Sequence, residues 1–257
     1  LEHLGGNRNM YATNCIGGVQ KDIPEEDIKK IEDVINSLKT PADLFYGAVK
    51  DDPVIHARLK NVGILSEEET HKTGALGPTV RGSGIKTDVR RDDPYAAYGM
   101  VDWEVITWDS SDVYGRAMVR ICECYESIKI INQCVAALKK IKSHEIAVEV
   151  KEILPGEAVG HAEAPRGETM HYVRSDGTNR PVRHKMRAPT YNNINTFKPM
   201  CKNESISDAV LIMASIDPCY SCTERVVLIN ENKEKKILTQ KDLIRLSLEK
   251  TERIKKN

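Results

Sequence analysis

DSSDVYGRAMVRICECYESIKIINQCVAAL, residues 109–138, is the stretch that determines the expected fold. Apolar residues recur in it every three or four positions, which is the period of one face of an α-helix. Asp109, Ser110 and Ser111 precede them as capping residues. The pattern predicts a helix of roughly 30 residues, about 45 Å long at 1.5 Å per residue, and a bundle of helices to cover its apolar stripe. That stripe consists of Tyr114, Met118, Ile121, Tyr125, Ile128, Ile131, Val135 and Leu138.

Three helices are expected before this stretch. Acidic residues open the first, over 23–38, where the helix dipole favours negative charge. A shorter helix follows over about 41–50, and another begins after Asp52-Pro53. Residues 62–99 are rich in Gly, Pro and charge, so we expect mostly loop there.

The pattern changes after the long helix. Two strands, Met170–Arg174 and Arg180–Met186, flank the turn residues 175–178 and predict a β-hairpin. Ser207 is expected to cap a short helix that runs to Ile216 and leads to a pair of cysteines. The predicted class is therefore α+β, mostly α, with a core of long bundled helices and a small β-hairpin region near the C-terminal cysteine pair.

Charge and cysteine content exclude several classes of protein. The 38 basic residues balance 38 acidic ones, so nothing indicates a nucleic-acid binder. No apolar run reaches the length of about 18 residues that a bilayer-spanning helix needs, and no secretion signal is visible. Seven cysteines, an odd number, argue against a disulfide framework and for a reducing compartment.

Cys219-Tyr220-Ser221-Cys222 contains the cysteine pair that is a candidate for metal binding or catalysis. A closed zinc site needs four ligands, and a thioredoxin-type pair would follow a strand, so neither assignment fits. Two thiolates at this spacing can hold a soft transition metal from one side, although a structural or incidental role is also open. The cysteines at 15, 122, 134 and 201 are expected to be small buried apolar residues.

Residues 215–225, Ser-Ile-Asp-Pro-Cys-Tyr-Ser-Cys-Thr-Glu-Arg, resemble the C-terminal metal-binding motif of [NiFe] hydrogenase large subunits. The resemblance is greatest to the energy-converting group, which includes formate hydrogenlyase and is related to the 49-kDa subunit of respiratory complex I. The complex I branch has lost the metal cysteines, so the pair separates the two families. Other segments typical of both stand in order along the chain: Ile16–Val19, Arg81–Ile85, Asp88–Arg91, Pro94–Tyr98, Glu163–Glu168, Ser175–Gly177 and Arg187–Thr190.

The resemblance implies a nickel–iron centre with cyanide and carbon monoxide on the iron. Cys219 would be a terminal thiolate on nickel, and Cys222 would bridge nickel and iron. In such subunits a further pair of cysteines lies near the N-terminal end. Cys122 and Cys124 have the wrong spacing to replace that pair, so we expect it upstream of Leu1, in a longer protein of which this chain is a C-terminal part.

The resemblance also implies roles around the metals. Arg166 would place its permanently charged guanidinium over the open coordination site, and with Asp217 and Cys219 it completes the expected catalytic set. Thr190 would donate to a cyanide, and Pro165 would wall the pocket. Taken without the resemblance, an Arg after Ala-Pro is ordinarily a surface residue and Asp-Pro is ordinarily a turn.

Residues 226–257 resemble an extension that a maturation endopeptidase removes after nickel chaperones have delivered the metal. The cut would fall between Arg225 and Val226, which divides the chain into the hydrogenase portion, 1–225, and the extension, 226–257. A permanent solvated helix is the other interpretation of this tail. Arg225 stands where uptake hydrogenases carry a further metal-binding His, so we expect no magnesium site there.

The implied function is reversible reduction of protons to hydrogen on the cytoplasmic face of a membrane, by a peripheral subunit. Electrons would pass through a [4Fe-4S] cluster in a small subunit, because this chain lacks the thiols for such a cluster. Antiporter-like membrane subunits would couple this electron flow to ion movement. Two alternatives are open. One is a metal-free quinone-site scaffold like the complex I 49-kDa subunit, and the other is a non-catalytic assembly protein.

A charged group in residues 81–93 has two interpretations. It is predicted to be a solvated charge network, although a proton path or a quinone-side path is an alternative. The group consists of Arg81, Arg90, Arg91, Asp88, Asp92 and Asp93.

Overall fold

A computed structural model describes residues 2–8, 13–141, 145–223, 228–229, 235–236 and 238–255. The chain forms two compact units, Leu1–Cys219 and Tyr220–Asn257. The larger unit is mostly helical with a small antiparallel sheet, so the predicted α+β class is confirmed. None of the helices in the described segments has both the length and the apolar character needed to cross a bilayer.

The predicted long helix is α8, Val113–Leu138. It has 26 residues rather than about 30, because it begins later than expected. The predicted caps at 109–111 are wrong: the N-cap is Asp112, whose carboxylate accepts a hydrogen bond from the Gly115 amide at 2.8 Å. Asp112 also accepts from the Asn61 amide at 2.8 Å, so the cap fixes the preceding loop as well.

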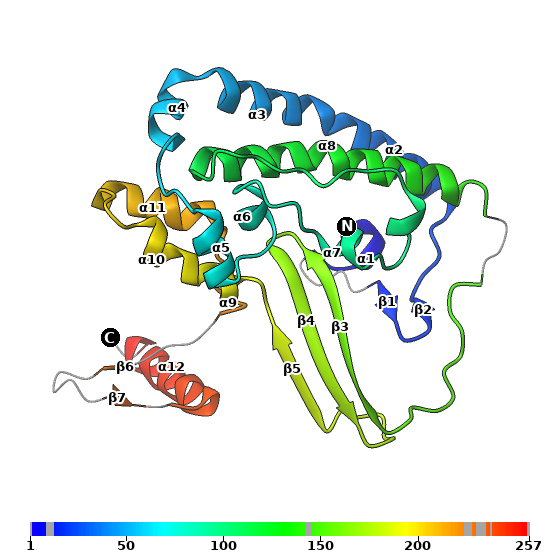
Figure 1. The fold of residues 1–257 in the computed structure, drawn as a ribbon. Helices are drawn as coiled ribbons and strands as arrows, with labels where there is room; N and C mark the ends of the chain where they lie inside the picture. Colours follow the sequence, from blue (N-terminus) through cyan, green and yellow to red (C-terminus); the bar gives the residue numbers. More distant parts are fainter. Residues whose placement is uncertain are drawn as a thin grey trace. The chain divides into compact units, whose positions relative to one another are not determined.

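Helix α8 packs against several other helices of the larger unit, including α6 (Pro78–Arg81) and α11 (Ile206–Ser215) (Figure 1). The three helices predicted before it are confirmed, and each of them contacts α8. Asp52 caps the third with its side chain, and Pro53 occupies the first helical position, where its missing N–H costs nothing. These helices are α2 (Glu25–Ser37), α3 (Lys39–Asp51) and α4 (Pro53–Leu59).

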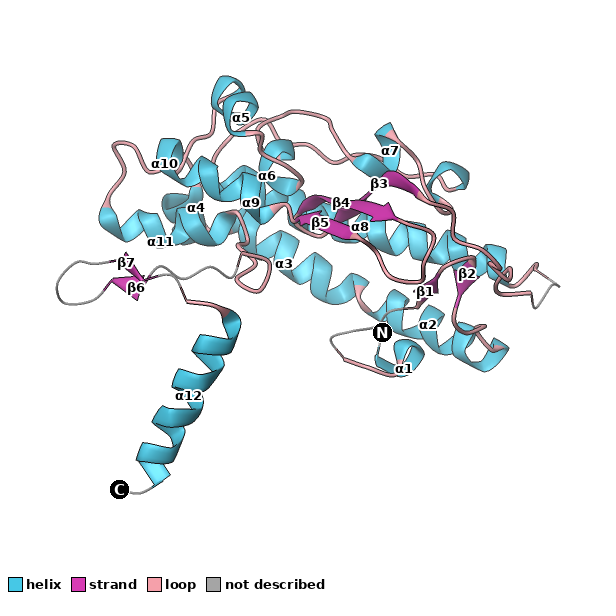
Figure 2. Cartoon of the chain, turned by 90° about the horizontal axis from the view of Figure 1, so that it is seen from below, coloured by secondary structure: helices cyan, strands magenta, loops and turns pink. Residues whose placement is uncertain are grey.

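The sheet has three antiparallel strands rather than the two of a hairpin. Figure 2 shows β3 (Gly156–Ala164), β4 (Gly167–Ser175) and β5 (Arg183–Arg187) side by side. Strand β3 was not predicted, because its Gly- and Ala-rich sequence has little intrinsic β propensity. It forms by pairing with β4 over its whole length, from Gly156 opposite Ser175 to Ala164 opposite Gly167.

The expectation of mostly loop over 62–99 is wrong in part. Ser66 caps α5 by accepting from the Glu69 amide, and Glu67, Glu68 and Glu69 fill the first turn. This is a helix-start signal that the Gly and Pro content of the region obscured. The other short helices here are α6 (Pro78–Arg81), α7 (Val89–Asp92) and η1 (Tyr98–Met100), and α5 itself covers Glu67–Thr73.

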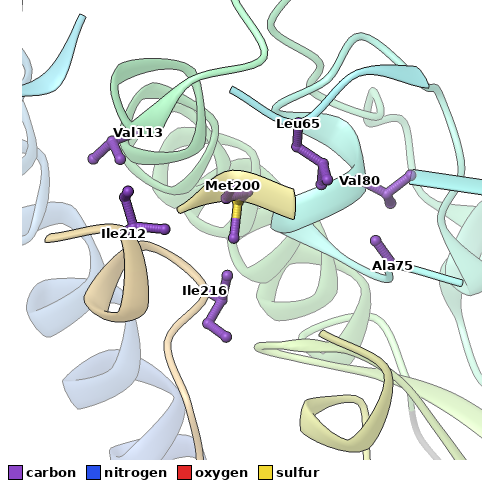
Figure 3. Close-up of a cluster of buried hydrophobic side chains, with 7 residues drawn as sticks. All are labelled: Leu65, Ala75, Val80, Val113, Met200, Ile212 and Ile216. Carbon is purple, nitrogen blue, oxygen red and sulfur yellow. The ribbon is translucent and has the colours of Figure 1, made fainter. Parts of the chain in front are cut away.

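The apolar core lies where short helices meet the N-terminal end of α8 (Figure 3). Helix α11 (Ile206–Ser215) contributes Ile212 to it and is capped by Ser205 rather than by Ser207. The remaining members of the core are Leu65, Ala75, Val80, Val113, Met200 and Ile216. Helices α9 (Thr190–Asn193), η2 (Ile194–Thr196) and α10 (Phe197–Met200) lead the chain from the sheet to this core.

The ends of the chain carry smaller elements. Helix α1 (Glu2–Gly5) precedes the two-residue strands β1 (Asn14–Cys15) and β2 (Gly18–Val19). The smaller unit contains β6 (Leu228–Ile229), β7 (Lys235–Lys236) and α12 (Gln240–Lys255).

We expect Ile212→Ala to lower the free energy of unfolding by about 2–5 kcal/mol, because it removes a fully buried side chain and leaves a cavity. Val210→Ala is the control, since Val210 lies on the same helix with 72% of its surface exposed, and it should change stability by less than about 0.5 kcal/mol. Urea unfolding of the intact chain measures both. Equal losses in the two variants would contradict this placement of the core.

Candidate metal-binding segment and its surroundings

The segment that follows α11 turns sharply before the first cysteine of the pair. The Asp217 amide donates to the Ala214 carbonyl at 3.0 Å, and Asp217 itself has a φ of 53°. Asp tolerates this left-handed conformation better than most residues, and Pro218 prevents the helix from continuing. The turn therefore ends α11 and directs the chain to Cys219.

Arg166 holds this turn from the opposite side. It lies in the turn that connects β3 to β4. Its Nε donates to the Asp217 carbonyl at 2.7 Å, and its Nη2 donates to the Asp217 carboxylate at 3.0 Å. The next residue, Gly167, has a φ of 121°, and a Cβ there would lie 2.7 Å from the Gly77 nitrogen. Both features require glycine, so the tight turn that presents Arg166 depends on Gly167.

Thr190 fixes the backbone of Cys219. Its hydroxyl accepts a hydrogen bond from the Cys219 amide at 3.2 Å, and Thr190 is 1% exposed at the start of α9. Cys219 itself is half-buried. The structure thus brings together four of the residues expected at the site: Arg166, Asp217, Thr190 and Cys219.

Cys222 belongs to the smaller unit, three positions after Cys219 in the chain. Within that unit the Thr223 amide donates to the Tyr220 carbonyl at 3.2 Å, which closes a turn around the cysteine. The predicted cleavage residues, Arg225 and Val226, lie outside the described residues. The position of the cut, and with it the division at 225, stays a prediction.

Pro165 lines a polar pocket of about 370 Å³ next to this segment. Asp217 lines the same pocket, so the pocket reaches the residues that hold the cysteine turn. Its walls come from α6, α7, α8, the end of β3 and the turn after α11. The remaining lining residues are Arg81, Arg90, Arg120, Glu123, Cys124, Ser127, Glu163 and Ala164.

The donor groups fit one half of a thiolate metal site. Two cysteines at this spacing are suitable ligands for a soft transition metal, and a nearby guanidinium suits anionic ligands on it. Among the described residues no group of three or more His, Cys, Asp and Glu side chains is placed to bind a metal ion. A four-thiolate centre would therefore need two further thiols in addition to Cys219 and Cys222.

The prediction of a solvated charge network at 81–93 is wrong for Arg81 and Asp88, which are 1% and 2% exposed. Arg91, Asp92 and Asp93 do lie at the surface. Arg81 donates to Glu123 at 2.7 Å and to Glu163 at 2.8 Å, and both of these carboxylates are far away in sequence. The partners explain the burial, and they were not visible from the local sequence.

Two arginines of α8 were missed at the sequence level. Arg116 is fully buried, and Arg120 lies one turn later on the same face. The Nε and Nη2 of Arg120 are buried without a hydrogen-bond partner among the described residues. Burial lowers the pKa of Arg120, and Asp217 and Glu123 oppose that shift. The sequence signal that could have identified them is a pair of cationic residues four positions apart within an otherwise apolar helix.

Comparison with protein families gives one match over most of the chain. The family model described as "Respiratory-chain NADH dehydrogenase, 49 Kd subunit" matches residues 1–154 and 139–225. The match ends at residue 225.

Several curated proteins are similar to the chain. The membrane-bound hydrogenase subunit alpha of Pyrococcus furiosus is 37% identical over 100% of this chain and 63% of its own length. The carbon monoxide-induced hydrogenase of Rhodospirillum rubrum is 40% identical over 87% of this chain and 62% of its own length. An NADH-quinone oxidoreductase subunit of Herpetosiphon aurantiacus is 36% identical over 84% of this chain and 60% of its own length. The chain thus spans about three fifths of these relatives.

We expect Thr190→Val to lower the free energy of unfolding by about 1 kcal/mol, because the Cys219 amide loses its acceptor. Thr190→Ser keeps the hydroxyl and should remain near the parent. Amide hydrogen exchange at Cys219 provides a local measurement, with exchange roughly five times faster in the Val variant. Unchanged exchange in Thr190→Val would show that this hydrogen bond does not hold the cysteine segment.

Proposed function

The chain belongs to the family of the 49-kDa subunit of respiratory-chain NADH dehydrogenase. We propose that it is part of the catalytic large subunit of a membrane-associated [NiFe] hydrogenase. The curated relatives include subunits of hydrogenases and of NADH-quinone oxidoreductases. Membership in the family is compatible with either activity, so the choice depends on the cysteine segment.

The observation that carries the proposal is the arrangement around Cys219. Arg166 reaches Asp217 through two hydrogen bonds, and Thr190 holds the Cys219 amide. Three segments distant in sequence therefore fix the backbone of Cys219, next to a turn that a cation holds. A quinone-site scaffold has no evident need for a cysteine held in this way.

Cys219 and Cys222 would hold a nickel–iron centre, with cyanide and carbon monoxide on the iron, that supplies the chemistry of reversible hydrogen formation from protons. Arg166 contributes a charge that stays positive at all physiological pH values, and such a charge stabilises anionic ligands. Asp217 orients that guanidinium, and its backbone turn sets the direction of Cys219. Thr190 donates its hydroxyl proton toward an anionic ligand, while its oxygen accepts from Cys219, and Pro165 limits the access of water.

The proposed enzyme works within a membrane complex, as the names of several relatives suggest. Electrons pass to a [4Fe-4S] cluster in a small subunit, and antiporter-like membrane subunits couple the electron flow to ion movement. The large subunit is peripheral, on the cytoplasmic face. Nickel chaperones load the site, and a maturation endopeptidase then removes the extension 226–257.

The second candidate is a metal-free quinone-site scaffold. The NADH-quinone oxidoreductase relatives favour it, since their identity to the chain is similar to that of the hydrogenases. The two candidates differ in one measurable property, which is the presence of nickel and iron in the complex purified from its native host.

We expect Cys219→Ser and Cys222→Ser each to remove nickel from the complete subunit and to abolish hydrogen-dependent reduction of a viologen dye. Nickel affinity should fall by more than the roughly 10–100-fold that follows removal of a residue hydrogen-bonded to a ligand, because here a ligand itself is removed. Cys15→Ser, at an exposed position in β1, is the control. Full nickel content in both site variants would refute the assignment of these cysteines as metal ligands, whereas absence of nickel from the parent complex would favour the metal-free scaffold.

Maturation gives a second test. We expect the subunit from nickel-fed cells to end at Arg225, and the subunit from nickel-starved cells to retain Val226 to Asn257. Intact-mass spectrometry distinguishes the two forms. A tail retained in an active, nickel-containing enzyme would instead identify 226–257 as a permanent part of the protein.

A further inference from the structure

Arg81 holds two carboxylates on neighbouring nitrogens of one guanidinium group. Its Nε donates to the Glu123 carboxylate at 2.7 Å and its Nη1 to the Glu163 carboxylate at 2.8 Å. Arg81 is 1% exposed, so water contributes little to neutralising these charges. The nearby Asp88 also lies 3.3 Å from Arg81, but it has its own cation.

That cation is Arg90, which binds Asp88 through two hydrogen bonds of 2.9 Å and 2.7 Å. The two remaining carboxylates, Glu123 and Glu163, share Arg81, and Arg120 is a second cation that interacts with Glu123.

Glu163 is the more buried of the two carboxylates. Its side chain is 5% exposed, against 20% for Glu123. Burial raises the pKa of Glu163, Arg81 opposes the shift and Asp88 adds to it. Arg90 from α7 and the Tyr95 hydroxyl also face it, and the hydroxyl accepts from the Glu163 amide at 3.1 Å. Arg120 from α8 lines the same pocket.

The polar pocket connects this pair with the cysteine segment. Glu123 and Glu163 line it together with Pro165 and Asp217. Its volume of about 370 Å³ has room for several water molecules, each of which occupies about 30 Å³ in the liquid. The unpartnered Nε and Nη2 of Arg120, on the same pocket, are an independent indication that water or an anion completes it.

We propose that Glu163 and Glu123, held by Arg81, form a proton-transfer pair between the Arg166–Asp217 turn and the solvent. This inference rests on the proposed function, because only a reaction that releases or consumes protons at the cysteine segment needs such a route. In the oxidation of hydrogen, a released proton arrives through pocket water and binds a carboxylate oxygen of Glu163. The proton then passes to Glu123 and to bulk water. Both protons released from one hydrogen molecule take this route in turn, and the two electrons reduce two molecules of a one-electron acceptor such as a viologen.

The test uses the complete subunit in its purified complex with two variants, Glu163→Gln and Glu123→Gln. Each has a matched control. Glu168→Gln changes the residue opposite Glu163 in the β3–β4 register, and Glu126→Gln changes a carboxylate on α8 that is 20% exposed, as Glu123 is. Neither control residue lines the pocket.

The first measurement is infrared spectroscopy over a series of pH values from 4.5 upward, which detects a protonated carboxyl group by a carbonyl band that shifts in D₂O. We expect this band in the parent and in both controls, and its loss in Glu163→Gln. A folded-state pKa above the usual 4.5 also means that stability falls as pH rises above that value, because the folded state binds the extra proton. Glu163→Gln should abolish that part of the pH dependence.

The second measurement is turnover at equal nickel content. We expect both variants to reduce viologen with hydrogen about a hundredfold more slowly and with a larger solvent isotope effect, while the controls stay near the parent rate. Glu123 is the more exposed of the two residues, so Glu123→Gln still tests the inference if the Glu163→Gln variant does not assemble. Parent-like turnover in the variants, or a parent without the carboxyl band, overturns the inference. Absence of nickel from the parent refutes the proposed function instead, and metal analysis detects it before any variant is compared.

Discussion

The buried guanidinium of Arg116 is the interaction that organises the larger unit. Its Nη2 donates to the Gly63 carbonyl at 2.7 Å, its Nη1 to the Ser111 carbonyl at 3.1 Å and its Nε to the Ser215 hydroxyl at 2.9 Å. Burial lowers the pKa of Arg116 to about 9, so it stays charged at neutral pH. Taking a charge out of water costs several kcal/mol unless acceptors surround it, so the loop before α5, the approach to α8 and the end of α11 must meet at this point.

The cysteine segment takes its position from that meeting point. Ser215 accepts from Arg116, and only Ile216 separates it from Asp217, so the anchor and the turn that leads to Cys219 are nearly continuous. Gly63 has a φ of 61°, and a Cβ there would lie 2.7 Å from the Cγ1 of Ile212. The core around Ile212 and the hydrogen bonds of Arg116 therefore need the same glycine. Arg166, in the turn between β3 and β4, then holds Asp217 through two hydrogen bonds.

A polar interior beside an apolar core explains why one scaffold serves different relatives. The group around Arg81 is buried but charged, and it borders a pocket rather than filling the core. Such a lining can organise water and charge for chemistry at a metal or at a quinone. Fold and family membership are consequently compatible with either chemistry, and the few residues at the pocket's end determine which one occurs.

Local signals in the amino-acid sequence were enough to predict several elements. Helix α8 followed from its apolar period of 3.6 residues, α2 from its acidic first turn and α4 from Asp52-Pro53. The turn after β4 followed from Asp176-Gly177. The residues of the expected site came from a resemblance of short motifs rather than from periodicity. Neither source showed the N-cap Asp112, the strand β3 or the acidic start of α5.

Tertiary packing, in contrast, settles which distant residues meet. Arg166 and Asp217 are 51 positions apart, and Arg81 and Glu163 are 82 apart, so no helix or strand period links them. Strand β3 exists because β4 offers it a ladder of partners, and Arg81 is buried because Glu123 and Glu163 neutralise it. The physical reason is range: periodicity and capping act within a few residues, whereas the burial of charge depends on partners that only packing brings together.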